Sequence, residues 1–554
     1  MNTVTRLLLF PTVLAAFVVA SIVRADSPVH EADVVVYGDT PAAIVAAIQV
    51  KGMGKSVILV APKKQLGAMA SGGLGKTDKG KEGTIGGMSR EFFERVGKHY
   101  GKDIGWDFEP KVATAVYEEM LADAGLDDTA VRRGRRLDLT DGVTKNGSRI
   151  QEIRCESGER FRARVFLDCT YEGDLMALAG VAYHVGREPR SQYGEKLAGV
   201  LEPGSEDYRQ PKQFFEEGVD PHIEPGDPSS GLLPGIQGEG LAEPGTGDAK
   251  VQAYNFRLCL TTDPGNRIPF TKPNNYDPAR YELLARHIQA RVKGGLPVTL
   301  SERVAEGSTL LKVDRMPNNK TDINDGSPAS LDYIGANWDY PEGNYAVRER
   351  IWREHVDYTK GLIWFIGNDP RVPADVRSEM MAYGWPRDEY VDTDHFSHQL
   401  YVREARRMVG RYVMRQQDCE ETRTKDDSIG MGSYGVDSHH IQRVVVDGRI
   451  VNEGNFLARP TAYEIPYASL VPKSDECTNL LVPVCLSASH VAFGSLRMEP
   501  VWMILGQTAA TAAAQAIDAD ETVQKIDYGT LRERLLADGQ RLKLSEWDPA
   551  SAGR

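Results

Sequence analysis

A strand, a glycine loop and a helix of small residues near the start of the chain restrict the fold more than any other feature. The segment DVVVYGDTPAAIVAAI covers residues 33–48. Its apolar run predicts a buried strand at 34–37, and its alanines predict a helix from about 42 to 51, which glycines end. A second apolar run predicts another strand at 56–60. A helix between two strands with short links favours a parallel sheet, because the crossover helix must lie on the sheet face.

The loop between this strand and helix is suited to a diphosphate. Gly38 permits a tight turn, and a helix that begins near Pro41 would aim its free N–H groups and the positive end of its dipole at an anion. Thr40 and Ala43 stand where the G-x-G-x-x-G pattern has its second and third glycines. The loop alone is a weak signal, because any buried strand–helix–strand unit could contain it.

The rest of the chain predicts mixed helix and strand. Short alternating runs from 131 to 168, divided by Asn-Gly and Ser-Gly turns, predict a small antiparallel meander. The Pro- and Gly-rich stretch 201–250 predicts a long surface connection into a second domain. Helices are predicted at about 87–101, 109–125, 278–293, 344–360, 395–417 and 501–517, and further strands at 251–262 and 477–490.

The N-terminal segment and the charge limit where the protein works and what it binds. Residues 1–25 combine an early arginine, a long apolar run and small residues before Asp26, which is typical of a cleavable secretory signal; an uncleaved anchor is the alternative. We therefore expect a periplasmic or secreted protein, with no stable membrane insertion after cleavage. The net charge of −13 and the lack of a basic block argue against nucleic acid as a partner. The six cysteines contain no CxxC pair, so we expect buried free thiols.

Three later loops have the composition of ligand-binding loops. Glycines and small residues crowd QLGAMASGGLG, residues 65–75, where the backbone would pass close to a flat ligand. LDCTYEGDLMALAG, residues 167–180, and GSLRMEPVWMILGQTAATAAA, residues 494–514, each join a turn to the start of a helix. Three such loops, far apart in the sequence, are economical if all of them line one cofactor.

These loops resemble those of a large bacterial family of secreted FAD-dependent oxidoreductases, with a flavoprotein fold of the glutathione reductase and fumarate reductase type. Members carry VVYGGTPAG, LGGMTSGGLG, a D-A-T-x-E-G-D segment and L-V-P-V-C-L-S-A-x-H with R-M-E-P. The middle pieces KTDIN, GANWDYPEGNYAVRERI, YVREARRMVGRYV and DSIGMGSYGVDSHHIQR extend the match over nearly the whole mature chain. The resemblance implies an α/β fold: a Rossmann-like FAD-binding domain, with a parallel sheet and a small antiparallel meander, and an inserted α+β substrate or cap domain.

The FAD-binding domain is expected to be discontinuous. We predict a signal peptide at 1–25, the first part of the FAD-binding domain at 31–200, the substrate or cap domain with its Pro- and Gly-rich entry at 201–454, the second part of the FAD-binding domain at 455–530, and a C-terminal tail at 531–554.

The resemblance also implies which residues bind FAD. The first loop would face the diphosphate, the 67–75 loop would run beside the ribityl chain and the flavin, and Asp168 would lie near the diphosphate and the ribityl chain. The 498–507 segment would close over the pyrimidine edge of the flavin. The expected cofactor-binding residues are Gly38, Thr40, Pro41, Ala42, Ala43, Ala61, Gly67, Met69, Ser71, Gly72, Gly73, Asp168, Thr170, Asp174, Met498, Glu499, Pro500, Gly506 and Gln507.

Four residues depart from the family pattern. Asp39, Ala43 and Ala68 replace glycines, and Ala61 replaces an acidic residue that would ordinarily bind the adenosine ribose. A carboxylate at Asp39, if it points at the diphosphate, would repel it. We expect weakened FAD binding rather than none.

The segment GVDSHHIQR, residues 435–443, offers a catalytic base. If it is extended, successive side chains alternate faces, so His439 and His440 cannot both enter one pocket, and Asp437 shares the face of His439. We favour His439 as the base over His440, with Asp437 orienting its ring; structural or surface histidines are the alternative. Asp437 and His439 could bind a metal, but no third ligand is near, so none is expected.

Two arginines are candidates for the catalytic site. Arg403 lies in the predicted helix 395–417, where it would form a cluster with Arg406, Arg407 and Arg411 that could grip a carboxylate or a hydroxyl-rich substrate. A solvated helix face is the alternative. Arg497 has a better positional argument, because it precedes Met498 in the loop expected to close over the flavin.

The sequence therefore predicts an exported FAD-dependent oxidoreductase. We expect it to transfer hydride between bound FAD and a small polar organic substrate, with a sugar or hydroxy acid preferred, and to pass electrons to an unknown acceptor. The alternatives are a non-oxidative carbohydrate-active enzyme such as a lyase, and a binding protein that kept the fold without the cofactor.

Overall fold

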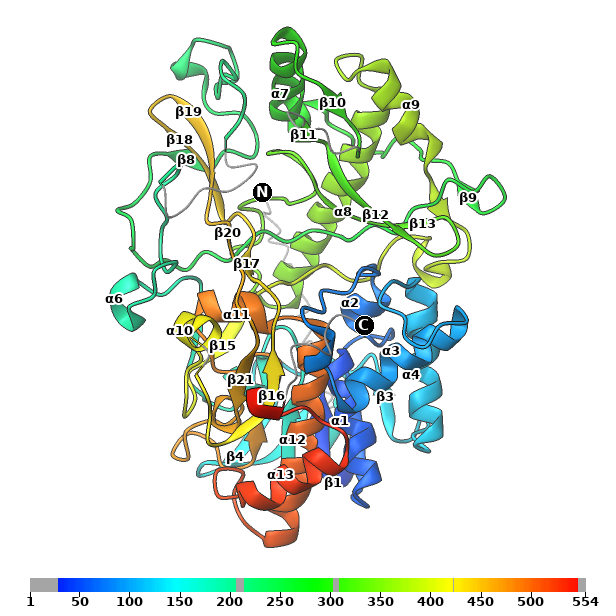
Figure 1. The fold of residues 1–554 in the computed structure, drawn as a ribbon, viewed down its shortest axis with the longest axis vertical. Coiled ribbons are helices and arrows are strands. Elements are labelled where there is room, and N and C mark those ends of the chain that lie inside the picture. Colours follow the sequence, from blue (N-terminus) through cyan, green and yellow to red (C-terminus); the bar gives the residue numbers. More distant parts are fainter. Residues whose placement is uncertain (1–27, 206–213, 302–307, 422, 547–554) are drawn as a thin grey trace, which may run out of the picture.

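The protein forms two regions, one above the other in Figure 1. This computed structural model describes residues 28–205, 214–301, 308–421 and 423–546. The predicted signal peptide lies outside the described residues. Among the residues that are described, no helix has both the length and the apolar character needed to cross a membrane.

A seven-stranded sheet is the centre of the lower region. Its order is β3-β2-β1-β6-β5-β4, and β22 pairs with β6. The pairs β1–β2, β1–β6, β2–β3 and β6–β22 are parallel, whereas β4, β5 and β6 form an antiparallel meander. The predicted parallel sheet with a small antiparallel meander is confirmed. The strands are β1 Val29–Tyr37, β2 Val57–Ala61, β3 Val131–Arg133, β4 Val143–Asn146, β5 Arg149–Arg154, β6 Arg160–Asp168 and β22 Leu480–Leu481.

Two helices made of small residues pack together against this sheet. They are α1, Pro41–Gly52, and α12, Glu499–Ala519. A Cβ added at Gly506 would come within 2.5 Å of the Ala42 carbonyl oxygen, so the backbones approach too closely for a larger residue. Figure 1 shows both helices in the lower region. The other helices there include α3 Gly87–His99, α4 Pro110–Asp123, α11 His490–Leu496 and α13 Tyr528–Ala537.

The upper region combines helices with short antiparallel strands (Figure 1). Its hairpins are β12 with β13 and β18 with β19. The division of the chain into domains at the predicted boundaries stays a prediction. The elements are α7 Glu282–Lys293, α8 Tyr345–Asn368, α9 Ala374–Ala382, β12 Leu311–Met316, β13 Lys320–Asp325, β18 Gln442–Val446 and β19 Arg449–Glu453.

The predicted helix at 395–417 is wrong. The chain there is irregular, forms the short strand β15 (Arg406–Met408) beside β7 (Tyr183–Val185), and becomes helical only in α10, Gln416–Glu420. Its backbone bonds to distant segments instead: Tyr401 N–H donates to the Asn255 carbonyl and Met408 N–H to the Cys485 carbonyl. The segment is buried on every side rather than along one stripe, so helical spacing was misleading.

Two predicted strands are also shorter than expected. Residues 251–262 make only isolated bridges, at Leu258 and Thr261, and only Leu480–Leu481 of the predicted strand 477–490 joins the sheet. Both segments are deeply buried, and their apolar character reflects that burial rather than a regular ladder. The six cysteines are buried and free.

Candidate active site

The first predicted cofactor loop lies between β1 and α1. Gly38 has φ +149°, and a Cβ there would sit 2.5 Å from the Cys169 carbonyl oxygen, so only glycine fits. The Thr40 hydroxyl accepts from Ala43 N–H at 3.3 Å, which caps α1, and donates to the Cys169 carbonyl at 2.7 Å. Pro41 is the first residue of the helix, as predicted. The turn that precedes α1 is therefore fixed in position, and the free N–H groups of the helix follow it directly.

The second loop contains α2, Ala68–Ser71, with glycines on both sides. Gly67 and Gly73 have φ +90° and +118°, which favour glycine. Added Cβ atoms at Gly72 and Gly73 would meet Gln399 Cβ at 2.4 Å and the Arg257 carbonyl at 2.3 Å, so these glycines let the segments around residues 257 and 399 approach closely. Met69 N–H contacts the Tyr171 hydroxyl at 3.3 Å. The Ser71 hydroxyl donates to the Leu66 carbonyl at 2.6 Å, within its own loop.

Asp168 organises the loop that follows β6. Its carboxylate accepts from Thr170 N–H at 3.1 Å, from the Thr170 hydroxyl at 2.6 Å and from Met176 N–H at 2.9 Å. Burial raises the pKa of Asp168 to about 6, despite these bonds. The carboxylate and Thr170 therefore hold this loop in position.

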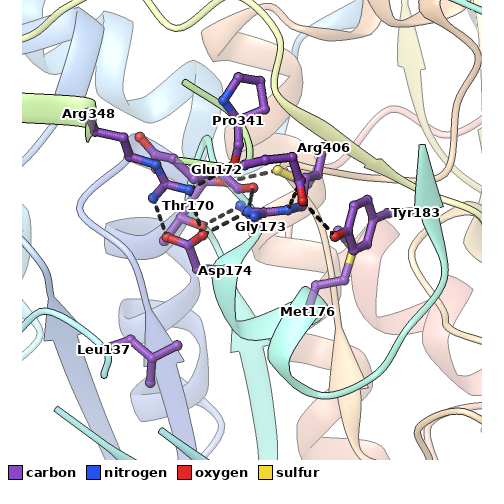
Figure 2. Close-up of polar contacts among 12 residues, drawn as sticks. Leu137, Thr170, Glu172, Gly173, Asp174, Met176, Tyr183, Pro341, Arg348 and Arg406 are labelled. Atoms are coloured by element: carbon purple, nitrogen blue, oxygen red, sulfur yellow. Dashed lines mark hydrogen bonds and ion pairs between the residues drawn. The ribbon is translucent and has the colours of Figure 1, made fainter. Parts of the chain in front are cut away.

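Asp174 joins this loop to the upper region. Figure 2 shows Arg348 and Arg406 pointing toward its carboxylate. Arg348 donates to both Asp174 oxygens at 2.6 and 2.8 Å, and Arg406 donates at 2.8 Å. Burial alone would raise the pKa of Asp174, but the two arginines outweigh it and lower the pKa. Asp174 is thus bound to cations of the protein itself.

The third of the later loops, residues 494–514, contains the start of α12 and is called the third loop below. Met498 is the N-cap, and Glu499 and Pro500 begin the helix. Burial raises the pKa of Glu499 to about 8, although the Tyr171 hydroxyl bonds to its carboxyl group. Gly506 and Gln507 lie two turns further on and make packing contacts: Gly506 with Ala42, and Gln507 with the N–H of Met88 at 3.0 Å.

The arrangement fits a bound dinucleotide. Buried polar atoms usually have hydrogen-bond partners, yet within the described residues Glu499 Oε2 and Trp502 Nε1 have none. Both belong to the first turn of α12. The N-termini of two helices and partnerless buried groups are what a ligand with a diphosphate and a polar ring would satisfy. Ala61, buried at the end of β2, offers only a methyl group.

A second cluster surrounds His439. Its Nδ1 lies 2.5 Å from Asp332 Oδ2, and its Nε2 lies 4.0 Å from Asp437 Oδ2. Asp437 and His439 therefore share one face, as the alternation of side chains in an extended segment predicts. Asp332 is held in turn by Asn255 at 2.8 Å and by Arg403 at 3.2 Å. Burial would raise the pKa of Asp332, but Arg403 and His439 lower it.

Arg497 and Tyr401 complete this cluster. Arg497 contacts Asp437 Oδ2 at 3.1 Å and donates to the Tyr401 hydroxyl at 3.2 Å. The Tyr401 ring lies 4.5 Å from the Arg403 guanidinium and 5.9 Å from that of Arg497. Burial raises the pKa of Asp437. Tyr401 and Met498 both line a small cavity beside α2, which places the cluster next to the third loop.

The structure brings together four of the predicted catalytic residues: His439, Asp437, Arg403 and Arg497. His440 is buried, and its carbonyl accepts from Ala253 N–H at 3.0 Å. The predicted arginine cluster does not form, because each side chain finds a different partner. Arg406 bonds to Asp174, Arg407 to Glu188 and Glu404, and Arg411 to the Gln524 carbonyl.

Sequence reasoning missed Asp332, Tyr401 and Asn255. Asp332 is 107 residues from His439 in the chain, so no local spacing could connect them. Their location in the sequence could have indicated two of them, because both lie in or beside segments that resemble the family. Tyr401 opens YVREARRMVGRYV, and Asp332 lies just before GANWDYPEGNYAVRERI.

Two groups of side chains have the composition of metal sites. Asp325, Asp332 and His439 present ligand atoms within 4.8 Å of one another, as do Glu109, Asp388 and Glu389. Each group already contacts a cation of the protein. The Arg403 guanidinium lies against Asp332, and the fully buried Lys320 ammonium lies 2.5–2.9 Å from the other three carboxylates.

Comparison with known proteins identifies one family. The sequence model of a family described as FAD dependent oxidoreductase matches residues 33–535. No curated protein matches the sequence. Among solved structures, a geranylgeranyl bacteriochlorophyll reductase-like protein from Thermoplasma acidophilum is similar at 10% identity over 95% of this chain and 87% of its own, with a TM-score of 0.32. A flavin monooxygenase from Stenotrophomonas maltophilia is 16% identical over 25% of this chain and 38% of its own, with a TM-score of 0.19. A cyclohexanone monooxygenase from Rhodococcus sp. Phi1 is 15% identical over 25% of this chain and 26% of its own, with a TM-score of 0.20.

Proposed function

Because this chain belongs to the family of FAD-dependent oxidoreductases, we propose that it transfers hydride between bound FAD and a small polar organic substrate, with a sugar or hydroxy acid as the preferred class. FAD, when bound, supplies the two-electron chemistry. The observation that carries the proposal is the His439 cluster, which combines a base, two guanidinium groups, a phenol and two carboxylates beside the third cofactor loop.

His439 is the proton acceptor in this proposal. In this proposal the Nδ1–H of His439 donates a hydrogen bond to Asp332, which holds the ring in one orientation and leaves Nε2 to accept a proton. Nε2 faces the side on which Asp437 lies, and the His439 side chain keeps 11% of its surface exposed. Oxidation of an alcohol releases a hydroxyl proton together with the hydride, and Nε2 would take that proton.

The surrounding groups would bind a hydroxyl-rich or carboxylate-bearing substrate. Asp437 keeps 24% of its side-chain surface exposed and can accept hydrogen bonds from hydroxyls, whereas Arg497 and the Tyr401 hydroxyl can donate to substrate oxygens. Arg403 contacts Asp332 rather than the accessible side of the ring, so its role is to hold that carboxylate. This mixture of donors and acceptors supports a sugar or hydroxy acid over an apolar substrate.

The FAD would be held by the loop before α1, the glycine loop around α2 and the loop at the start of α12. The N–H groups that begin α1 and the turn at Gly38 would receive the diphosphate. The glycines around α2 would lie along the ribityl chain and flavin, and the start of α12 would lie near the pyrimidine edge. Ala61 gives no hydrogen bond to the adenosine ribose.

An anaerobic screen tests the proposal. The mature protein, loaded with FAD, is mixed with sugars and hydroxy acids, and bleaching of the flavin absorbance reports reduction. His439→Ala should slow reduction without lowering flavin content, and His440→Ala is the matched control that should keep the rate. Bound FAD that no compound of either class reduces would refute the substrate class. Flavin loss in His439→Ala would make that residue structural.

We also propose that the protein is exported and passes its electrons to a separate acceptor. The support is the apolar N-terminal segment at 1–25. Sequencing the N-terminus of the native protein, together with fractionation of cells, tests the export. A native chain that begins at Met1 in the cytoplasm would refute it. Reoxidation of the reduced flavin by quinones, dyes and oxygen in turn would identify the class of acceptor.

A further inference from the structure

Asp39 places a buried carboxylate in the loop expected to hold a diphosphate. It lies between Gly38 and Thr40, is 5% exposed, and its backbone carbonyl accepts from Gly67 N–H at 2.8 Å. The side-chain atom Oδ2 has no hydrogen-bond partner within the described residues. A diphosphate at the start of α1 would meet this charge at close range and in a poorly hydrated site, where repulsion is strong.

Two of the other carboxyl groups around this loop are already neutralised. Asp174 is bound by Arg348 and Arg406. Glu499 retains its proton at neutral pH, because burial raises its pKa to about 8. Glu172 accepts from the Tyr340 hydroxyl at 3.0 Å, and burial raises its pKa. Asp168 follows β6 and is held by the hydrogen bonds of its own loop, whereas Asp39 lies in the loop that starts α1, so its charge acts directly on an anion bound there.

Lys63 is the cation that faces Asp39. Its Nζ lies 3.7 Å from Asp39 Oδ2. It follows β2 by two residues, on the same strand end as the alanine at 61. Nζ also donates to Gln399 Oε1 at 2.5 Å, and Gln399 packs against Gly72, so a second group holds the ammonium in position.

We propose that Lys63 is a cofactor-binding residue of this chain, which neutralises Asp39 and thereby lets the α1 loop accept the diphosphate of a dinucleotide. With Lys63 in place the Asp39–Lys63 pair carries no net charge, and the positive end of α1 acts on the diphosphate unopposed. Without it the loop presents a buried negative charge to another negative charge. The proposal rests on FAD being the cofactor.

A double-mutant cycle on FAD affinity tests this. After the flavin is removed and the protein reconstituted, quenching of flavin fluorescence gives the dissociation constant for wild type, Lys63→Met, Asp39→Gly and the double variant. Lys63→Met should weaken FAD binding about tenfold, because one charge interaction of ~1.4 kcal/mol is lost. The same substitution in the Asp39→Gly background should change the dissociation constant less than about threefold. Asp39→Gly alone should bind FAD at least as tightly as wild type.

Three controls make the readout specific. Lys64→Met removes the adjacent, exposed lysine and should leave the dissociation constant unchanged. Lys63→Arg keeps the charge and should keep the affinity. Riboflavin has no diphosphate, so any stabilisation that it gives against thermal unfolding should be the same in wild type and Lys63→Met, whereas stabilisation by ADP should fall.

Two results would overturn the inference. One is a Lys63→Met protein that binds FAD as tightly as Lys64→Met does. The other is an equal loss of affinity in both the wild-type and the Asp39→Gly backgrounds, since Lys63 would then act independently of Asp39. A wild-type protein that binds no FAD would overturn this inference together with the proposed function, whereas FAD binding without substrate oxidation would affect the proposed function alone.

Discussion

Arg348→Met should lower the free energy of unfolding, because it removes an ion pair that joins α8 to the loop that follows β6. Arg348 is 6% exposed, donates to both oxygens of Asp174, and also bonds to the carbonyls of Tyr340 and Pro341 at 3.0 and 2.9 Å. Removing one partner of a buried ion pair costs about 3–5 kcal/mol. Arg406 still contacts Asp174 at 2.8 Å after the change, so we expect the lower end, about 3 kcal/mol.

The pH dependence gives this prediction a sign. The two arginines hold the pKa of Asp174 below its ordinary value despite burial. A depressed pKa in the folded state contributes stability above the unfolded pKa of about 3.9 and loses it as the pH falls through the folded value. In the variant the carboxyl group loses its main partner and its pKa rises. The difference in stability between wild type and variant should therefore be largest at neutral pH and shrink toward pH 4.

Urea unfolding followed by tryptophan fluorescence, at neutral and at acidic pH, measures this difference. Arg353→Met is the control on the same helix, because Arg353 is 71% exposed and pairs only with Glu349 within the described residues; it should leave the unfolding midpoint unchanged. An Arg348→Met protein that unfolds at the midpoint of the control, or one that loses the same stability at both pH values, would contradict this prediction.

Three further predictions concern other buried groups. Asp332→Asn should slow flavin reduction at least about tenfold and shift its pH profile while the FAD dissociation constant is unchanged, because the His439 ring loses its anchor; stopped-flow traces with an unaltered rate would contradict this. Glu499→Gln should become more stable relative to wild type as the pH rises from 4.5 to about 8, by at most ~1.4 kcal/mol per pH unit. The cause is the raised pKa of Glu499, which makes ionisation of this group in the folded protein unfavourable. Melting temperatures of the two proteins that change in parallel with pH would refute this prediction. Lys320→Met should lower the free energy of unfolding by about 3–5 kcal/mol, because it leaves buried carboxylates without a cation. Lys111→Met, at a half-exposed lysine, is the control and should change it little. Soluble yield and urea midpoints measure the difference.

The sequence was most informative where a single face is buried or a turn needs a particular residue. The helices α3, α4 and α8 and the meander follow from periodicity and turn residues, whereas the strand and helix around Gly38 and the helix α12 follow from runs of apolar and small residues. The shared face of Asp437 and His439 follows from the alternation of side chains in an extended segment. These features depend on contacts between neighbours in the sequence.

Features made by distant contacts could not be found in this way. The helix expected around Arg403 fails because the segment is buried on all sides and its arginines bond in different directions. The pairing of Asp332 with His439 and that of Lys63 with Asp39 exist only once the chain is folded. The sequence showed that the Asp39 carboxylate would repel a bound anion, but it did not show which cation lies beside that carboxylate.

The sheet and the helices that cover it are built from segments near both ends of the chain, and this affects the order of folding during synthesis. The first sheet strands end by residue 168, but β22 and α12, which complete the sheet and pack on α1, come from residues 480–519. Gln49 bonds to Thr511 across 462 residues. A growing chain must therefore expose the small-residue face of α1 until nearly all of it has left the ribosome. Truncations before residue 480 should aggregate rather than fold, and we expect FAD to bind only after α12 has been made.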